Sequence, residues 1–490
     1  MQEVTTLGVV GAGPMGAGIA QIGLTSGLQV VLFDLNADAL GKAAQDIDGR
    51  IARLVEKSML PPGFAEEARA RLTLASTLDA FAPCEVVIEA IIERLEPKQK
   101  LLADLERIVA ADAILATNTS SLSVAAIASP CADKTRVCGL HFFNPVPLMK
   151  LVEVVLAPST SAQTAERATA FAKQVGKAPV TVKDGPGFLV NLQGRAYSQE
   201  ALAVVQEGVT DPATLDRIMR DGAGFRMGPF ELMDLTGIDV NFPATTYIYE
   251  GYQHDPRLKT TTLHELMANA GLFGRKTGKG FFDYSDGAGF PPAPAAPANP
   301  APVNVSLAEA CPELEALVAA AGFGKGGDVL LIAPVGEDCA TVCARLGLDP
   351  KKTVALDLTA IDRKHLSVMS AIGGRTVAAA VADWLRGAGY AVEQIEDSPG
   401  FVLQRMLGMI ANLGCELAQI GIGTPEDIDL AMQLAQNYPK GPIEWGEWLG
   451  AARTHTIMCN VQAITGSDRY RPSLWLRRRA QLGLSLYQKA

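Results

Sequence analysis

The sequence predicts an α/β fold in which a parallel, Rossmann-like sheet precedes an all-helical domain, a degenerate α/β segment and a second copy of the helical domain. Short β-branched runs alternate with amphipathic helical stretches over residues 1–183, a pattern typical of a parallel sheet covered by helices. From residue 184 to about residue 272 only helical periodicity remains. The third observation is an internal repeat with an offset of 213 residues.

The strands of the N-terminal domain are short and rich in valine, isoleucine and leucine. Such nearly continuous apolar runs are typical of parallel strands that are buried on both faces. The predicted strands are residues 7–10, 30–34, 86–89, 114–117, 137–141, 151–155 and 180–182.

The repeat starts where the helical domain starts. The pentapeptide DGPGF at residues 184–188 reappears as DSPGF at residues 397–401. Because the match continues at a single offset without a gap, we infer that the helical domain has been duplicated. Further matching pairs are Asp216 with Asp429, Met219 with Met432, Glu231 with Glu444 and Gly237 with Gly450.

A change in composition separates the first helical domain from the rest of the chain. Residues 285–303 include the stretch FPPAPAAPANPAP, which is typical of a semi-rigid extended linker. Strands are predicted again at residues 329–333 and 354–358. The predicted domains are the parallel sheet at 1–183, the helical domain at 184–284, the linker at 285–304, the degenerate α/β segment at 305–396 and the second helical repeat at 397–490.

The composition is that of an ordinary globular protein. Of 490 residues, 48% are hydrophobic and 20% are charged, which is enough for several cores. The net charge of −10 is spread along the chain, so we expect no nucleic-acid partner. We expect no secretory leader and no membrane partner. The eight cysteines include no CxxC pair, which predicts a cytoplasmic protein without a metal site.

A glycine-rich turn after the first strand predicts a dinucleotide site. Residues 11–16 read GAGPMG and open a helix. In this fingerprint Gly11 permits the tight turn, Gly13 lets the pyrophosphate approach and Gly16 allows close helix packing. Asp34 ends the second strand, where a carboxylate accepts hydrogen bonds from the ribose and repels a 2′-phosphate. The pattern therefore predicts NAD, with a purely structural glycine turn as the alternative.

A second group of polar residues lies at later strands. His141 ends one predicted strand and Glu153 lies on the next, so their side chains can face each other. A carboxylate on one ring nitrogen fixes the histidine tautomer, and the other nitrogen can take a hydroxyl proton while a hydride leaves the same carbon. Residues 118–121, NTSS, follow another strand and offer amide and hydroxyl groups to the same area. For His141 alone, a structural histidine is the alternative.

Several motifs taken together resemble the L-3-hydroxyacyl-CoA dehydrogenase family. They are ATNTSSL at 116–122, GLHFFNPVP at 139–147, KLVEV at 150–154 and PGFLVN at 186–191. The resemblance runs nearly unbroken from Gly11 to Tyr284. It implies NAD-dependent oxidation of an L-3-hydroxyacyl-CoA to the 3-oxoacyl-CoA.

The resemblance also implies roles for single residues. His141 would be the general base, Glu153 would orient it, and Ser120 and Asn191 would hydrogen-bond the C3 oxygen of the substrate. Lys57 falls near the family's lysine on the CoA phosphate, with a solvated helix face as the alternative. The residues expected to contact NAD are Gly11, Gly13, Met15, Gly16, Asp34, Glu93, Lys98 and Asn118.

The C-terminal half narrows the expected substrate. Its motifs at 438–442 and 469–472 resemble members of the family that oxidise 3-hydroxyadipyl-CoA in bacterial phenylacetate catabolism. The second carboxylate of that substrate would need a cation, for which Arg226 and Arg195 are candidates. A 3-hydroxybutyryl-CoA or a general fatty 3-hydroxyacyl-CoA is the alternative substrate, and a catalytically inactive NAD-binding structural protein is the alternative function.

The second helical copy is expected to be non-catalytic. At the repeat offset Asn191 corresponds to Gln404 and Glu153 to Leu366, and no GxGxxG or counterpart of His141 precedes them. Short members of the family dimerise through the helical domain. Residues 397–490 are therefore expected to dock on residues 184–280 as an intramolecular pseudo-dimer, with a homo-oligomer as the alternative.

Overall fold

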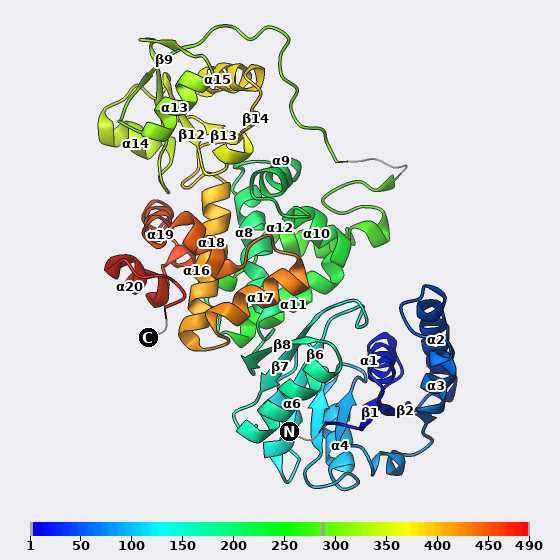
Figure 1. Cartoon of the computed structure of the whole chain (residues 1–490). Helices are drawn as coiled ribbons and strands as arrows, with labels where there is room; N and C mark the ends of the chain where they lie inside the picture. The colour runs from blue at the N-terminus through cyan, green and yellow to red at the C-terminus, as the bar shows by residue number, and fades with distance from the viewer. Residues whose placement is uncertain (1–2, 286–289, 489–490) are drawn as a thin grey trace. The chain divides into compact units, whose positions relative to one another are not determined.

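The computed structural model describes residues 3–285 and 290–488, which fall into two compact units (Figure 1). The first unit contains Met1–Asn191 and Gly421–Gln436, and the second contains Leu192–Ile420 and Asn437–Ala490. Part of the predicted linker, residues 286–289, lies outside the described residues. A short segment from the second helical repeat thus folds with the N-terminal sheet.

The first unit is built on an eight-stranded sheet with the order β3-β2-β1-β4-β5-β6-β7-β8. All seven predicted strands are present, and β3 is additional. Its strands are β1 (Thr6–Val10), β2 (Gln29–Phe33), β3 (Leu72–Leu74), β4 (Val86–Glu89), β5 (Ile114–Thr117), β6 (Val137–Phe142), β7 (Leu151–Leu156) and β8 (Ala178–Lys183). Its helices are α1 (Pro14–Thr25), α2 (Ala37–Glu56), α3 (Phe64–Ala70), α4 (Leu95–Glu106), α5 (Val124–Ile127), α6 (Ala162–Gln174) and α17 (Pro425–Gln436), and α7 (Val190–Gln193) spans the unit boundary.

The sheet is not wholly parallel, which corrects the prediction. Strands β6 and β7 pair antiparallel, and every other pair in the sheet is parallel. Only residues 143–150 join β6 to β7, and a parallel pair needs a crossover of a dozen or more residues. The short connection therefore dictates the antiparallel pair.

The second unit combines the two helical copies with a second sheet. Its helices are α8 (Arg195–Gln206), α9 (Pro212–Arg217), the π-helix η3 (Ile218–Gly222), α10 (Pro229–Thr236), α11 (Ile238–Gly251), α12 (Thr262–Asn269), α13 (Pro312–Ala320), α14 (Cys339–Leu346), α15 (Arg375–Gly387), α16 (Leu403–Ile420), α18 (Pro442–Leu449), α19 (Ala451–Thr465) and α20 (Leu474–Leu482). Its strands are β9 (Asn304–Leu307), β10 (Gly324–Lys325), β11 (Val329–Ile332), β12 (Thr353–Asp357), β13 (His365–Met369) and β14 (Ala391–Gln394). The sequence predicted only β11 and β12 among these strands.

The second sheet repeats the part of the first sheet that precedes the helical domain. Strands β11 to β14 pair parallel, antiparallel and parallel, as β5 to β8 do. Helix α15 lies 213 residues after α6, between the last two strands in both cases. The duplication therefore includes the second half of the sheet as well as the helical domain.

The strand register corrects the predicted counterparts of His141 and Glu153. The last residue of β5 pairs with Gly139, and the last residue of β11 pairs with Ala355. Two residues further along, His141 faces Glu153 in one sheet and Asp357 faces Ser367 in the other. Glu153 thus corresponds to Ser367 rather than Leu366, because the offset is 214 in β13 and becomes 213 only from α15 onward.

The entry into both helical copies has the same unusual backbone. Gly187 and Phe188 have φ angles of 77° and 49°, and Gly400 and Phe401 have φ angles of 73° and 51°. A bulky residue with positive φ is a genuine outlier, so its recurrence at equivalent positions supports the duplication.

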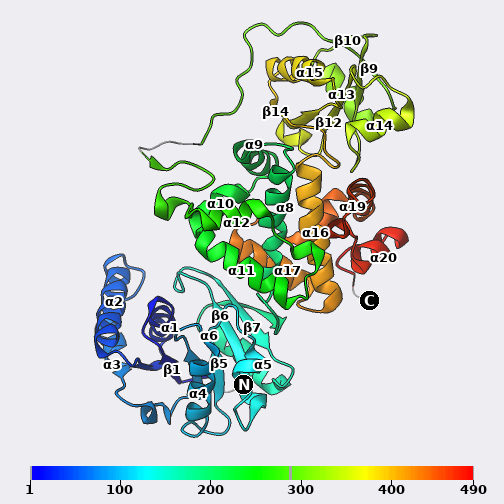
Figure 2. The same cartoon turned by 180° about the vertical axis from the view of Figure 1, so that it is seen from behind.

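Within the second unit, helix α8 of the first copy packs beside α16 of the second, as Figure 2 shows. Gln193 donates a buried hydrogen bond of 3.0 Å to the carbonyl of Ile410. Glu200 of α8 forms buried ion pairs with Arg405 of α16 at 2.5 Å and with Arg469 at 2.7 Å. No helix among the described residues is long and apolar enough to cross a membrane.

Candidate active site

The glycine-rich turn has the geometry that a dinucleotide requires. Gly11 has a φ of 106°, and a Cβ there would lie 2.4 Å from the carbonyl oxygen of Ala90. A Cβ on Gly16 would lie 1.8 Å from the carbonyl oxygen of Gly11, so only glycine allows this approach. A Cβ on Gly13 would meet nothing within 4 Å, which leaves the turn open to a ligand.

The first turn of α1 offers backbone N–H groups at this opening. Gly13 is the N-cap and supplies no side-chain hydrogen bond, while Pro14 has no N–H of its own. The N–H groups of Met15 and Gly16 therefore remain for an anion, and the helix dipole favours a negative charge there. These residues fit the pyrophosphate of a dinucleotide.

Asp34 follows β2 and ties the turn to the second strand. Its Oδ2 accepts a hydrogen bond of 2.7 Å from the N–H of Ala12, and its Oδ1 accepts one of 2.9 Å from Asn36. The side chain is only partly buried. Because each carboxylate oxygen has a second lone pair, Asp34 can also accept hydrogen bonds from a ribose.

Lys98 lies between two carboxylates and is almost fully buried. Its Nζ is 2.6 Å from Glu89 Oε1 and 3.1 Å from Glu93 Oε2. The second oxygen of Glu89 accepts a hydrogen bond of 2.7 Å from the hydroxyl of Thr117. The lysine therefore positions Glu93 from inside the protein and has little surface left for a cofactor.

Glu93 holds the loop that follows β5. Its Oε1 accepts hydrogen bonds from the Thr119 hydroxyl at 2.5 Å, the Ser121 hydroxyl at 2.9 Å and the Ser120 N–H at 3.1 Å. Burial by itself raises the pKa of Glu93, but the hydroxyl of Thr119 and the charge of Lys98 outweigh it and lower the pKa. Glu93 is therefore a charged anchor for this loop.

His141 and Glu153 form a buried pair. Their Cα atoms are partners across β6 and β7, and His141 Nδ1 lies 2.6 Å from Glu153 Oε2. The other oxygen of Glu153 accepts hydrogen bonds from the N–H groups of Leu189 at 3.0 Å and Val190 at 2.9 Å. Because the carboxylate accepts from Nδ1, that nitrogen carries the proton and Nε2 presents a lone pair.

The remaining polar residues of the predicted site lie around this pair. Asn118 Oδ1 accepts a hydrogen bond of 2.9 Å from the N–H of Phe142, the residue after His141. Asn191 Nδ2 donates to the carbonyl of Ser120 at 3.4 Å. Ser120 itself is exposed. The loop after β5, the end of β6 and the start of α7 thus meet in one place.

Other predicted residues are not joined to this cluster by the structure. Lys57 is the exposed C-cap of α2. Arg226 is exposed in the second unit. Arg195 is buried in the second unit, where it donates to Thr245 at 2.6 Å, and burial lowers its pKa to about 10.

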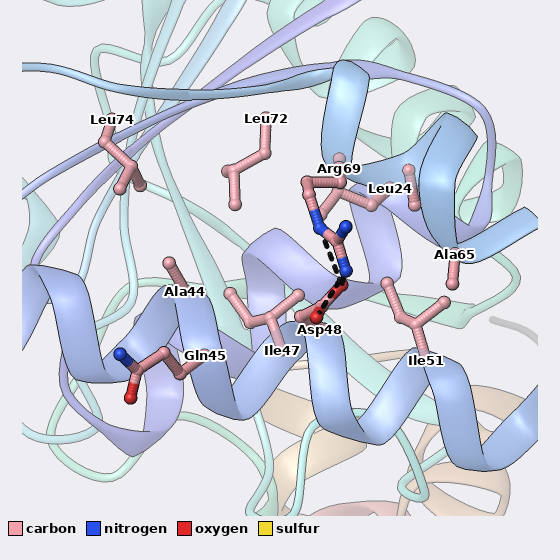
Figure 3. Close-up of a pocket in the computed structure, with 11 residues that line it drawn as sticks. Leu24, Ala44, Gln45, Ile47, Asp48, Ile51, Ala65, Arg69, Leu72 and Leu74 are labelled. Atoms are coloured by element: carbon pink, nitrogen blue, oxygen red, sulfur yellow. Dashed lines mark hydrogen bonds and ion pairs between the residues drawn. The ribbon is translucent and has the colours of Figure 1, made fainter.

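Figure 3 shows a pocket in the first unit. It is formed by residues of α1, α2, α3 and β3, and most of its lining is apolar. Arg69 and Asp48 form an ion pair of 2.7 Å within it. None of the residues predicted for the cofactor or for catalysis lines it.

The sequence interpretation missed Glu89 and the backbone donors of Leu189 and Val190. Glu89 is fully buried at the end of β4, and an acidic residue that closes an otherwise apolar strand was the available indication. The two N–H groups carry no side-chain pattern, so only the fold reveals them.

The corresponding place in the second sheet is closed by its own side chains. Gln404, the counterpart of Asn191, donates a hydrogen bond of 3.0 Å to Asp357, the counterpart of His141. Its amide oxygen accepts from the N–H of Gly336 at 2.9 Å. His365 of β13 is buried in the second sheet, but among the described residues no hydrogen bond or ion pair joins it to a carboxylate.

Family models match most of the chain. The model described as "3-hydroxyacyl-CoA dehydrogenase, NAD binding domain" matches residues 6–185. The model described as "3-hydroxyacyl-CoA dehydrogenase, C-terminal domain" matches twice, at residues 187–284 and 400–488. The double match confirms the duplicated helical domain.

Relatives match either the whole chain or its first part. A 3-hydroxyadipyl-CoA dehydrogenase of Escherichia coli K12 is 36% identical over 98% of both chains. The human mitochondrial hydroxyacyl-coenzyme A dehydrogenase is 39% identical over 56% of this chain and 90% of its own. A crystal structure of a 3-hydroxybutyryl-CoA dehydrogenase from Escherichia coli K12 has a TM-score of 0.89 and 36% identity, covering 98% of this chain and 99% of the other. This chain therefore belongs to the 3-hydroxyacyl-CoA dehydrogenase family and is an NAD-dependent oxidoreductase.

Proposed function

We propose that His141 is the general base that this enzyme uses to oxidise the C3 hydroxyl of an L-3-hydroxyacyl-CoA. The observation that carries the proposal is the buried 2.6 Å pair of His141 and Glu153 in the sheet that also carries the dinucleotide turn. Glu153 holds the imidazole in one orientation and stabilises it once it is protonated.

The residues of the chain account for the proton in this reaction. Bound NAD supplies the acceptor for the hydride, which takes one hydrogen and two electrons from C3. His141 Nε2 accepts the hydroxyl proton, so the O–H bond breaks as the C3–O double bond forms. Ser120 and Asn191 are proposed to hydrogen-bond the C3 oxygen, and the hydrogen bond from the Asn191 amide to the Ser120 carbonyl, which brings the two residues together, supports this.

The dinucleotide would be held by the N-terminal turn and the residues around it. Gly11, Gly13, Met15 and Gly16 would contact the pyrophosphate, and Asp34 the ribose. Glu93, Lys98 and Asn118 shape the other side of the site; we propose that Lys98 acts there through Glu93, to which it is paired.

The decisive variant for this chemistry is His141→Gln, which keeps the size of the side chain but cannot accept the proton. We expect kcat for oxidation to fall about 10²- to 10⁴-fold, the usual contribution of a general base. The rate of the wild type should rise with pH until the imidazole is neutral. A His141→Gln variant with full activity and a flat pH profile would refute the proposal.

The substrate that we propose is 3-hydroxyadipyl-CoA. The whole-chain relative of that name supports it, whereas the whole-chain structural relative described as a 3-hydroxybutyryl-CoA dehydrogenase supports the alternative. The test is kcat/KM for NAD-linked oxidation of both substrates at one pH. A preference of tenfold or more for the dicarboxylate, about 1.4 kcal/mol, would indicate a carboxylate site. Equal or reversed values would assign the enzyme to general fatty 3-hydroxyacyl-CoA metabolism.

Exposed basic side chains are proposed to bind the distal carboxylate and the CoA phosphate of the substrate. Arg226 is exposed, whereas Arg195 is buried and hydrogen-bonded to Thr245, so Arg226 is the better candidate for the distal carboxylate. Exposed Lys57 is the candidate for the CoA phosphate. Arg226→Gln should raise KM for 3-hydroxyadipyl-CoA but not for 3-hydroxybutyryl-CoA, and Lys57→Gln should raise both.

We also propose that the two helical copies act as an intramolecular pseudo-dimer. The buried contacts of Gln193 with Ile410 and of Glu200 with Arg405 support this. Sedimentation at increasing protein concentration would then give the mass of one chain, whereas a homo-oligomer would give a multiple of it.

We propose a cytoplasmic location for the protein. None of the eight cysteines, all in the described residues, forms a disulfide, which supports this location.

A further inference from the structure

Helix α17 comes from the second helical copy, yet it packs against β7 and β8 of the first unit. Its inner face is apolar and completely buried at Ile428, Ala431 and Met432. Strand β7 carries Glu153. The second copy therefore contributes a helix to the sheet that holds the pair of His141 and Glu153.

The segment 421–436 contacts the chain on both sides of the turn that follows β8. The carbonyl of Ile422 accepts a hydrogen bond of 3.0 Å from the N–H of Lys183, the last residue of β8. Gln436, the last residue of α17, donates to the carbonyl of Val190 at 3.5 Å. A Cβ at Gly423 would lie 3.7 Å from Leu189 Cδ2, which is ordinary van der Waals distance.

The turn that α17 contacts is the one that holds Glu153. The N–H groups of Leu189 and Val190 both donate to Glu153 Oε1, and Glu153 Oε2 faces His141 Nδ1. A shift of this turn would therefore move the carboxylate that orients the imidazole. Displacements of about 1 Å at a catalytic group can cost 10²-fold in rate.

The first copy makes the same contact with the second sheet. The N–H of Glu396 donates a hydrogen bond of 2.9 Å to the carbonyl of Val209. Glu396 lies 213 positions after Lys183, and Val209 lies 213 positions before Ile422, so this hydrogen bond is equivalent to the one between Lys183 and Ile422. Helix α9 and the π-helix η3, which correspond to α17, pack on the second sheet, where Arg217 pairs with Glu393 at 2.7 Å. The two copies thus exchange one helical segment, but among the described residues a histidine is hydrogen-bonded to a carboxylate only in the first sheet.

We propose that α17 is a positioning element for the oxidation, so that the second copy serves the active site as well as the packing of the fold. Through its hold on residues 183–190 it fixes the two N–H groups that orient Glu153 and thereby His141. This inference rests on the proposed role of His141 as the general base.

The exchanged helices provide a matched pair of variants. Met432 of α17 and Met219 of η3 occupy equivalent positions, and both side chains are fully buried. Met432→Ala should lower kcat about tenfold or more, while KM for NAD stays within about twofold because the dinucleotide turn is untouched. In a plot of kcat against pH, the midpoint of the rise on the acidic side should move to lower pH. The reason is that a less firmly held Glu153 carboxylate favours the protonated imidazole of His141 less. Met219→Ala should lose comparable stability and keep both kcat and the midpoint.

The contrary result is a Met432→Ala variant whose kcat and pH midpoint match those of Met219→Ala. Gln436→Leu, which removes a single donor near the surface, is the second variant if Met432→Ala does not fold. It should reduce kcat and move the midpoint in the same direction, and an unchanged profile would overturn the inference. His141→Gln, measured in parallel, separates the two claims: an active His141→Gln variant ends the proposed function, whereas an inactive one beside an unaffected Met432→Ala ends only this inference.

Discussion

His141 and Glu153 are direct partners across antiparallel strands β6 and β7, and their facing side-chain atoms are 2.6 Å apart. Residues that oppose each other in this way project to the same face of the sheet. Glu153 is fully buried, and its other oxygen is held by the N–H groups of Leu189 and Val190. The carboxylate therefore has one orientation available, and so does the imidazole that it holds.

Replacing Glu153 by glutamine should disable the base without changing the shape of the site. The amide can donate to Nδ1, which would favour the tautomer with its proton on Nε2, where the lone pair is needed. We expect kcat to fall about 10²- to 10⁴-fold, with KM for NAD nearly unchanged. Steady-state kinetics in both substrates would measure this effect. The exposed Glu166 of α6 provides the control Glu166→Gln, and equal activity of the two variants would contradict the prediction.

Asp34 should determine the choice of NAD over NADP. Its carboxylate braces the N–H of Ala12 and carries the negative charge that a 2′-phosphate would meet. Asp34→Asn should lower kcat/KM for NAD about 10- to 100-fold, equivalent to about 1.4 to 2.8 kcal/mol. The corresponding value for NADP should fall less or rise. Asp38→Asn, at an exposed position in the first turn of α2, should leave the ratio unchanged.

The sequence was sufficient to predict the positions of candidate side chains that lie at or next to strand ends. Gly11, Asp34 and His141 each follow or end a predicted strand, and the structure places them at these positions. The hold of Leu189 and Val190 on Glu153 could not be predicted, because backbone N–H groups leave no trace in a pattern of residue types. The packing of α17 on the first sheet could not be predicted either, because it depends on the tertiary contacts of the helix and not on its own residue pattern.

The second sheet shows where strand prediction fails. Strand β13, which was not predicted, is as long as the predicted β12 but contains His365 and Ser367 at buried positions. Polar residues at buried positions interrupt the apolar run by which a strand is recognised. The pairing of β12 with β13 also corrected the counterpart of Glu153 by one residue, which no offset in the sequence indicates.

Lys98 should be essential for the loop that carries Ser120. The lysine is buried between Glu89 and Glu93, and Lys98→Met would leave both carboxylates without their cation. Removing one partner of a buried ion pair costs about 3–5 kcal/mol. We expect a lower melting temperature, and a lower kcat because the pKa of Glu93 should rise and weaken its hold on the loop. Lys100→Met, on the exposed side of α4, is the control and should change neither quantity.

Glu200 should make the packing of the two helical copies sensitive to acid. Burial by itself raises the pKa of Glu200, but the charges of Arg405 and Arg469 outweigh it and hold the pKa below its ordinary value. A carboxyl whose pKa is lowered by folding stabilises the protein above its unfolded pKa of about 4.3, and this stability is lost as the pH falls through the folded value. Glu200→Gln should therefore cost about 3–5 kcal/mol at pH 7 and progressively less below about pH 4.

Calorimetric melting of the wild type and Glu200→Gln between pH 7 and pH 3.5 would measure this difference. Glu207→Gln is the matched control, because Glu207 pairs with the same Arg405 but its side chain is 46% exposed. Because one carboxylate of this pair is half exposed to water, Glu207→Gln should lower the melting temperature less than Glu200→Gln, and its effect should depend less on pH. If the melting difference between Glu200→Gln and the wild type stayed constant down to pH 3.5, Glu200 would not be the carboxylate that links the two helical copies to pH.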